Sequence, residues 1–439
     1  MRDRQSFCRQ PPGWPSSGAL CFLFIAFLQS ATAGAQGTAS LGLSDCTEPP
    51  PQSKTEQFRF VRSEQQDAFA RDISPGSVIG SIRITRYDVF NMEDPKESNR
   101  LYRLANKLNV ITRESVIRDQ LLVVEGDDYN HGRLAESERL LRELDFLYDA
   151  TVRPWRVCGN VVDVEVITRD IWTLTPTINF SRSGGDNSYA FGISDSNILG
   201  TGKEVTYLRE NDADRSGNTF IYRDPALFGS RWNLRLTYSD NDDGYYRNFA
   251  VTRPFFSVYE RWSAGARATQ GKFENDTWFR GDEVTEFNQQ TDEYHIFGGL
   301  AVDVQEEQRV GRWRAGLHYE TNEFSFSDSN IPPEELPEDR DYAYPFIGYE
   351  SIEDEFKKVR NMNYLGRTED FFVGERYFWN AGWSDDSFGA TRDQIAFEGN
   401  YYNTLLVDDH QLWTVDTWLN GFWSVDDQDF ENLWWTAYT

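Results

Sequence analysis

The sequence predicts two folded parts, an α+β domain with the element order β-α-α-β-β and, after it, an antiparallel transmembrane β-barrel. Residues 77–170 pass from strand-like alternation to helical spacing and back, whereas residues 171–439 alternate apolar and polar side chains in about a dozen segments. Aromatic residues make up 15% of the chain and the net charge is -27. Such a composition suits rings at a membrane interface and acids in solvated loops.

The first 35 residues are typical of a secretory signal peptide. Three arginines among the first nine residues precede an apolar run at 19–28, and small residues offer cleavage after Ala33 or Ala35. A membrane-anchoring helix would need about 20 apolar residues, roughly twice the length of this run. We therefore expect an exported protein whose signal occupies 1–35.

Four cysteines are present, and Cys8 and Cys21 lie in the expected signal peptide. Cys46 and Cys158 remain, and in an oxidising compartment they either form a disulfide or stay as two thiols; the sequence leaves both open. The chain has four histidines, and none has ligand spacing to a cysteine or to another histidine. We therefore expect no metal site.

Residues 36–76 are polar, contain three consecutive prolines and show no periodicity, which predicts a linker. Alternation begins in "SVIGSIRITRYDVF" and returns in "VVDVEVITRD", so both segments are predicted strands. Helical leucine spacing between them predicts two helices, which we expect to pack on one face of the sheet. These leucines are Leu101, Leu104 and Leu108 in the first helix, and Leu134, Leu141 and Leu144 in the second.

The segment "WRAGLHYE" shows the alternation of the C-terminal part, with Trp313 and Leu317 on one face and Arg314 and Glu320 on the other. Such segments, roughly 8 to 12 residues long, fit either a soluble sandwich or an outer-membrane barrel. The signal peptide, the segment lengths and the Trp and Tyr residues at segment ends favour the barrel. The segment "RWSAGARATQ" argues against it, because its apolar face is mostly alanine.

The stretch "NILGTGKEV" has the glycines and lysine of a phosphate-binding loop, but the pattern is incomplete. Asn197 stands where the first glycine is needed, Glu204 stands where the metal-binding hydroxyl is needed, and a strand-like segment follows in place of a helix. Gly200 and Gly202 are therefore predicted to form a turn between antiparallel strands.

Other motifs carry no chemistry. The run "DNDDG" lacks the closing glutamate of a calcium loop and is predicted to be a hairpin turn. No nucleophile or histidine is placed for catalysis, so we expect neither an enzyme nor a cofactor. Nucleic-acid binding is disfavoured, because basic residues do not cluster and the net charge is strongly negative.

Three segments together resemble the Omp85 family, also called the bacterial surface antigen (D15) family, which includes BamA-like and TamA-like proteins. They are "EGDDYNHGRLAESERLLRELDFLYDATVRP", "VVDVEVITRDIWTLTPTINFSRSGGDNSYAFGISDSNILGTGKEVTY" and "YRDPALFG". The resemblance covers about 77–439 and is most specific at 126–229. It implies that 77–170 is a POTRA domain, that 171–439 is the barrel, and that Asn197, Gly200 and Gly202 lie in the hairpin joining early barrel strands.

The family resemblance implies a Gram-negative outer-membrane protein with its POTRA domain in the periplasm. Unfolded outer-membrane or exported proteins, outer-membrane lipid and periplasmic accessory subunits would be its partners. It would work by β-augmentation, offering sheet edges to incoming strands. A two-partner secretion pore or a passive outer-membrane channel is the alternative.

Two features depart from the family. Its Arg-Gly-Tyr or Arg-Gly-Phe loop motif is absent, since Arg280 and Gly281 are followed by Asp282. The residues after 171 are also too few for the family's barrel of about sixteen strands with loops. We therefore expect the chain to stop partway round the barrel.

Overall fold

The computed structural model describes residues 46–439 except for short gaps at 62, 184–185, 213–214, 281, 303–308, 329–330, 365 and 407–410. The expected signal peptide, with Ala33 and Ala35, lies outside the described residues. The described chain divides into two compact units. Residues 46–109 and 120–171 form the smaller unit, and residues 110–119 and 172–439 form the larger one.

The smaller unit is built on a four-stranded sheet with the order β1-β3-β4-β2. The central strand β4 runs parallel to β2 and antiparallel to β3, and the short strand β1 extends the other edge by pairing with β3. The strands are β1 (Cys46–Thr47), β2 (Val78–Tyr87), β3 (Leu147–Cys158) and β4 (Val161–Asp170).

Helix α5 (His131–Arg142) packs on β3 and supplies the core of the smaller unit. Leu134 and Leu141 are buried, as the leucine spacing predicts, and β4 contributes Val162, Val164 and Val166. The prediction of a second packed helix is wrong. Helix α3 (Arg100–Leu108) contains the three predicted leucines, but it buries none of its residues.

The stretch 36–76, expected to be a linker, holds β1 and two helices from Cys46 onward: α1 (Lys54–Phe58) and α2 (Glu64–Arg71). The buried side chain of Gln66 on α2 accepts a hydrogen bond from Arg153 of β3 at 3.0 Å. Arg153 in turn forms an ion pair with Glu165 of β4 at 3.0 Å. Short helices capped by serine side chains therefore lie against the sheet here, where aperiodic sequence suggested none.

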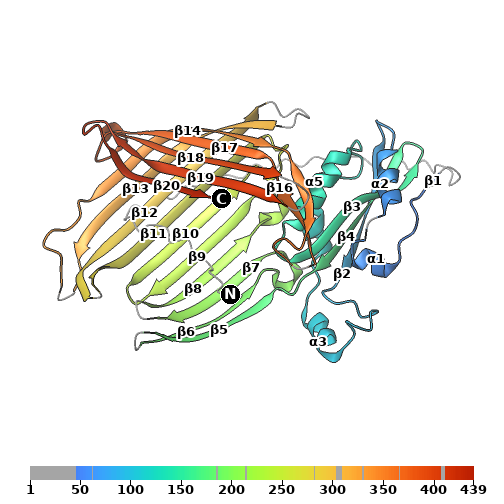
Figure 1. Ribbon diagram of the computed structural model, residues 1–439, viewed down its shortest axis with the longest axis horizontal. Helices are drawn as coiled ribbons and strands as arrows, with labels where there is room; N and C mark the ends of the chain where they lie inside the picture. Colours follow the sequence, from blue (N-terminus) through green and yellow to red (C-terminus); the bar gives the residue numbers. More distant parts are fainter. Residues whose placement is uncertain are drawn as a thin grey trace. The chain divides into compact units, whose positions relative to one another are not determined.

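The larger unit is a 14-stranded antiparallel sheet, which Figure 1 follows from green β5 to red β20. Neighbours in sequence are neighbours in the sheet, except that β14 pairs directly with β17 because the β15-β16 hairpin forms a separate two-stranded sheet. The strands are β5 (Leu174–Ser183), β6 (Asp186–Asp195), β7 (Glu204–Asn211), β8 (Ser216–Asp224), β9 (Asn233–Asn241), β10 (Gly244–Arg253), β11 (Trp262–Phe279), β12 (Asp282–Val302), β13 (Arg309–Phe326), β14 (Arg340–Glu353), β15 (Phe356–Arg360), β16 (Thr368–Phe372), β17 (Glu375–Ser384), β18 (Gln394–Leu406), β19 (Leu412–Ser424) and β20 (Phe430–Tyr438).

The sheet confirms the predicted run of antiparallel strands and corrects their lengths. Strands β11, β12 and β13 have 18, 21 and 18 residues, so the middle of the sheet extends well beyond the expected segments. The sheet curls, and in Figure 1 its last strands pass in front of its middle strands. A closed barrel is not formed by the described strands, because β5 pairs with β6 alone and β20 with β19 alone.

Residues 110–119 belong to the larger unit although they lie within the expected α+β domain. They contain the short helix α4 (Glu114–Arg118), in which Ile117 is fully buried. Among the described helices, none combines the length and the apolar composition needed to cross a membrane.

Candidate functional site

The two faces of the 14-stranded sheet differ in chemistry. On β13, Trp313, Leu317 and Tyr319 are exposed on one face, and Arg314 and Glu320 alternate with them on the other, as predicted. The register continues this pattern across the sheet, since Leu317 pairs with Ile296 of β12 and Trp313 with Tyr349 of β14. Exposed apolar side chains also mark the outer strands, among them Ile178, Phe191, Phe220, Phe249, Trp379, Leu419 and Trp435. The sheet therefore has one apolar, exposed face and one charged face.

The charged face contains a pocket of about 400 Å³. Arg267, Arg314 and Arg376 line it from three different strands, together with Glu350 and Glu398. Phe297, Phe346 and Phe378 supply apolar surface between these groups. This arrangement provides a polar space lined by charges of both signs, and its lining residues include no nucleophile and base in catalytic geometry.

Ion pairs connect charged side chains of the larger unit, both between neighbouring strands and between strands that are not paired with each other. Glu431 of β20 contacts Arg340 of β14 at 2.6 Å and Arg392 at 3.0 Å, and it accepts a hydrogen bond from Gln394 at 2.9 Å. Arg312, which is buried, pairs with Glu350 at 3.0 Å. Arg312 and Glu350 are register partners on β13 and β14, so their ion pair supports the register that the backbone hydrogen bonds set.

Strands β5 and β20 each present one edge without a strand partner in the described sheet. From Leu174 to Arg182 every residue of β5 is exposed, and Pro176 lies within this strand. Proline has no backbone N–H to donate to a neighbouring strand, and within sheets it is therefore found mainly in edge strands. A row of unpaired backbone N–H and C=O groups is a template for another strand. The described sheet has two such edges, and we take the β5 edge, whose residues from Leu174 to Arg182 are all exposed, as the candidate functional site.

The stretch "NILGTGKEV" forms the turn between β6 and β7, with Ile198–Gly200 as a single 3-10 turn. Gly200 and Gly202 both have φ 69°, a left-handed backbone conformation that glycine adopts without the steric cost of a Cβ. The Asn197 side chain accepts from the Gly202 N–H at 2.7 Å and donates to the Thr112 hydroxyl at 2.8 Å. The three residues singled out from sequence thus lie together in one turn.

Residues 110–113 lie against this turn. The Arg113 N–H donates to the Gly200 carbonyl at 2.9 Å, and a Cβ at Gly200 would lie 2.6 Å from the Ile111 carbonyl oxygen. Sequence reasoning missed this segment, because Thr112 and its neighbours show no periodicity. In the structure the Thr112 side chain is completely buried and accepts the hydrogen bond from Asn197.

The turn between β8 and β9 repeats the same geometry. Phe228 and Gly229 have φ 54° and 69°, matching 53° and 69° at Leu199 and Gly200. Here a Cβ at Gly229 would lie 3.2 Å from the Asp119 carboxylate. The residues 110–119 therefore contact both turns, and the similarity between "DSNILG" and "DPALFG" is the sequence signal that could have found the pair.

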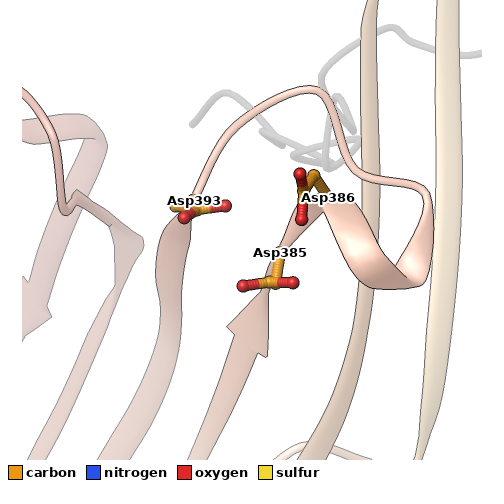
Figure 2. Close-up of side chains that lie close together, drawn as sticks. All are labelled: Asp385, Asp386 and Asp393. Carbon is orange, nitrogen blue, oxygen red and sulfur yellow. The ribbon is translucent and has the colours of Figure 1, made fainter.

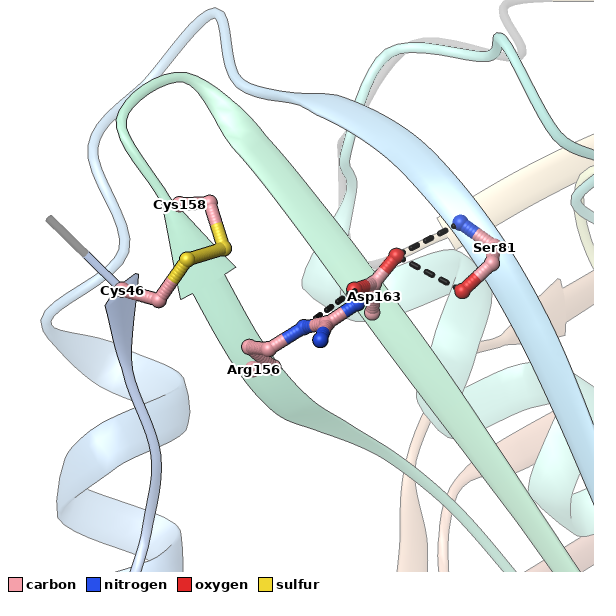
Figure 3. Close-up of a disulfide and its surroundings, with 5 residues drawn as sticks. All are labelled: Cys46, Ser81, Arg156, Cys158 and Asp163. Carbon is pink, nitrogen blue, oxygen red and sulfur yellow. Dashed lines mark hydrogen bonds and ion pairs between the residues drawn. A yellow bond between two sulfur atoms is a disulfide. The ribbon is translucent and has the colours of Figure 1, made fainter. Parts of the chain in front are cut away.

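In the smaller unit, Cys46 and Cys158 form a disulfide, so the two cysteines that the sequence left unassigned are joined (Figure 3). The bond holds β1 against the end of β3, where Cys46 and Cys158 are also register partners. It closes a loop spanning 112 positions in sequence.

Asp163 of β4 contacts Ser81 of β2 and Arg156 of β3, and Figure 3 shows these side chains. The parallel pairing shifts register between Ile79 and Ile82, and Asp163 accepts hydrogen bonds there from the Ser81 N–H at 2.8 Å and hydroxyl at 2.7 Å. Its other oxygen accepts from Arg156 Nε at 2.7 Å. Burial alone would raise the pKa of Asp163, but the bonds from Ser81 and Arg156 outweigh it and hold the pKa below its usual value.

Three aspartates between β17 and β18 lie close enough to contribute ligand oxygens to one cation: Asp385, Asp386 and Asp393 (Figure 2). Asp385 already accepts a hydrogen bond from the Ser387 N–H at 2.9 Å and so caps the short turn that follows. Exposed acidic groups often gather in this way without a metal, and no histidine or cysteine joins them. We assign no metal to this cluster.

No protein-family model matches the chain. Among solved structures, it is similar to BamA from Haemophilus ducreyi lacking POTRA domains 1–3, with 15% identity and a TM-score of 0.33 over 80% of this chain and 57% of that one. It is also similar to CdiB from Acinetobacter baumannii, with 11% identity and a TM-score of 0.31 over 82% of this chain and 73% of that one. The chain thus spans little more than half of the BamA structure.

Proposed function

We propose that the chain is an outer-membrane protein of the Omp85 family that inserts or translocates other proteins by adding their strands to its own sheet. Its smaller unit would be the periplasmic POTRA-like domain, and the 14-stranded sheet would lie in outer-membrane lipid. Its clients would be unfolded outer-membrane or exported proteins, delivered with periplasmic accessory subunits.

The observation that carries the proposal is the pairing of an apolar, exposed sheet face with a charged opposite face. Exposed apolar side chains such as Leu317 and Ile296 are costly in water, and a bilayer would cover them. The order β2, α3, α4, α5, β3, β4 ahead of the large sheet adds support, since a simple porin barrel does not carry an α+β domain.

The β5 edge supplies the mechanism. Each strand added in antiparallel register gives main-chain hydrogen bonds without regard to client sequence, while side-chain alternation selects apolar residues for one face. No proton transfer or cofactor is needed for this step. Pairing lowers the free energy of the client in the membrane, because its backbone N–H and C=O groups gain hydrogen-bond partners that lipid cannot supply.

Site-specific photocrosslinking tests this mechanism. A photoreactive residue replaces Asn179 on β5, and the matched control carries it at Thr206 on β7, a strand whose two edges are both paired. Cells expressing either variant are irradiated while outer-membrane proteins are being made. We expect client adducts at position 179 and few at 206; equal yields at both positions, or none at 179, would contradict the proposal.

The charged face favours a second candidate, a secretion pore or passive channel. The pocket lined by Arg267, Arg314 and Arg376 provides polar space along the middle of the sheet. A channel would give steady ion conductance in planar bilayers, with charge selectivity altered by Arg314→Gln and Arg376→Gln. Conductance of this kind without client adducts at position 179 would favour the channel over the assembly factor.

A further inference from the structure

Helix α3 exposes its whole apolar stripe. Leu101, Leu104 and Leu108 are 75%, 51% and 62% exposed, although their spacing is that of a helix face built for burial. Asn99 caps the helix by accepting hydrogen bonds from the Leu101 and Tyr102 N–H groups at 2.9 and 3.0 Å, so its start is well defined. The stripe is therefore a formed surface on an ordered helix.

The opposite side of α3 holds the helix to the smaller unit. The Tyr102 ring stacks on Phe90 with 4.2 Å between centroids. One turn later, the Asn106 side chain accepts from the Phe90 N–H at 3.0 Å and donates to the Phe90 carbonyl at 2.8 Å. At 3.6 residues per turn, the direction of Tyr102 and Asn106 lies roughly 140° from that of the leucines. Contacts to Phe90 thus turn the leucines outward.

Basic side chains flank the exposed leucines. Arg100, Arg103 and Lys107 are all exposed, and the nine residues of α3 contain no acidic residue, in a chain whose net charge is -27. A short helix with leucines on one side and basic residues beside them is typical of helices that lie in a membrane interface. Only Asn109 separates α3 from residues 110–113, which contact the β6-β7 turn.

We propose that α3 is a membrane-surface helix, which inserts Leu101, Leu104 and Leu108 into a leaflet with anionic headgroups. Arg100, Arg103 and Lys107 then contact the phosphates of those headgroups. A second copy of the chain fits the surface poorly, because a symmetric pairing of α3 helices would bring like charges together. This inference goes beyond the proposed function, since it assigns lipid contact to the smaller unit.

Charge and apolar surface both contribute to the expected binding. Each basic residue near an anionic surface is worth about 1 kcal/mol, which corresponds to roughly a fivefold change in the ratio of bound to free helix. Neutralising Arg103 and Lys107 together should therefore lower that ratio about 25-fold on anionic bilayers. It should change the ratio little on uncharged bilayers.

Fluorescence quenching in bilayers tests the inference on the full chain. Cys8 and Cys21 are changed to serine, and a polarity-sensitive fluorophore is attached at Leu104→Cys, with Ala68→Cys on the exposed side of α2 as the matched control. A third label at Leu317→Cys reports insertion of the sheet. The protein is reconstituted into phosphatidylcholine vesicles with or without phosphatidylglycerol, and nitroxide-labelled lipid is the quencher.

We expect the label at 104 to be quenched with phosphatidylglycerol present, the label at 68 to remain unquenched, and Arg103→Gln with Lys107→Gln to reverse the quenching at 104. A label at 104 that stays in water while 317 is quenched overturns the inference and leaves the proposed membrane location of the sheet intact. A label at 104 that is shielded from water without lipid quenching shows a protein partner and also overturns it. Absence of quenching at both 104 and 317 contradicts the membrane location itself.

Discussion

The ammonium of Lys203 lies 2.8 Å from a carboxylate oxygen of Asp224, whose side chain is only 2% exposed. Lys203 closes the β6-β7 turn, and Asp224 ends β8 and accepts the Ala226 N–H at 3.1 Å in the next turn. The lysine that completes an apparent phosphate-binding pattern therefore has a carboxylate partner from the same sheet. The bond to Asp224 holds the pKa of Lys203 above its usual value, against a smaller opposing effect of burial.

Replacing Lys203 with methionine should destabilise the larger unit by about 1 to 3 kcal/mol, because it leaves the buried Asp224 carboxylate without its cation. The folded-state pKa of Lys203 is raised, so its stabilising effect is fully present below the unfolded pKa of about 10.4 and is lost as pH rises through the folded pKa. Denaturant unfolding of the full chain in detergent, followed by tryptophan fluorescence, measures the change.

Two variants control this measurement. Lys203→Arg keeps the charge and should keep most of the stability, whereas Lys96→Met removes an exposed lysine of the smaller unit and should have little effect. If Lys203→Met unfolds at the same denaturant concentration as the natural chain, the ion pair does not stabilise the turns.

Sequence periodicity predicted strands and faces well, because alternation reports directly on which side of a sheet each residue lies. Trp313 and Arg314 take opposite faces as predicted, and the "NILGTGKEV" turn lies between two strands. Periodicity could not show where an amphipathic segment packs. The leucines of α5 are buried and those of α3 are exposed, although their spacing is alike.

Irregular segments were the least predictable. Thr112 is completely buried against the β6-β7 turn, and Gln66 lies in a helix within the expected linker. Both contacts depend on residues far apart in sequence, which no local pattern encodes. The choice between a disulfide and free thiols for Cys46 and Cys158 likewise required the distance between β1 and β3.

Gly200→Ala should destabilise the larger unit more than Gly389→Ala does. Both glycines have positive φ, 69° and 97°, so alanine at either position costs about 1 to 2 kcal/mol of backbone strain. At Gly200 the added Cβ would also lie 2.6 Å from the Ile111 carbonyl oxygen, whereas at Gly389 nothing lies within 4 Å. The loss of unfolding free energy in Gly200→Ala beyond that in Gly389→Ala therefore measures the contact with residues 110–113.

Hydrogen exchange locates this effect. Gly200→Ala should speed amide exchange at 110–113 as well as in the turn, since the Arg113 N–H bonds to the Gly200 carbonyl. Gly389→Ala should leave 110–113 unchanged. Equal destabilisation by the two substitutions would mean that the contact between Gly200 and residues 110–113 does not stabilise the fold.

Removing the disulfide by Cys46→Ser with Cys158→Ser should destabilise the smaller unit by about 2 to 5 kcal/mol, because the open chain gains conformational entropy when it unfolds. The loss should appear as faster hydrogen exchange in β3 and β4, with β9 to β13 unaffected. Reduction of the natural chain with dithiothreitol should reproduce it. The double variant should not respond to the reductant, and a natural chain that also fails to respond would contradict a stabilising role for the bond.

Asp163→Asn should weaken the smaller unit at neutral pH and flatten its acid sensitivity. The pKa of Asp163 is lowered in the fold by Ser81 and Arg156 despite the opposing effect of burial. A carboxylate of this kind contributes stability above its unfolded pKa of about 3.9, and the contribution is lost as pH falls through the lower folded value. The natural chain should therefore lose stability on acidification below about pH 4, and part of that loss should be missing in the variant.

The comparison requires a second aspartate that lacks these hydrogen-bond partners. Asp67→Asn, exposed on α2, should leave both the neutral-pH stability and its acid dependence close to those of the natural chain. Exchange rates in β2 and β4 should rise in Asp163→Asn alone, because the Ser81 N–H and hydroxyl lose a charged acceptor and Arg156 loses its ion pair. If the two variants show the same acid dependence, the carboxylate of Asp163 does not hold the irregularity in β2.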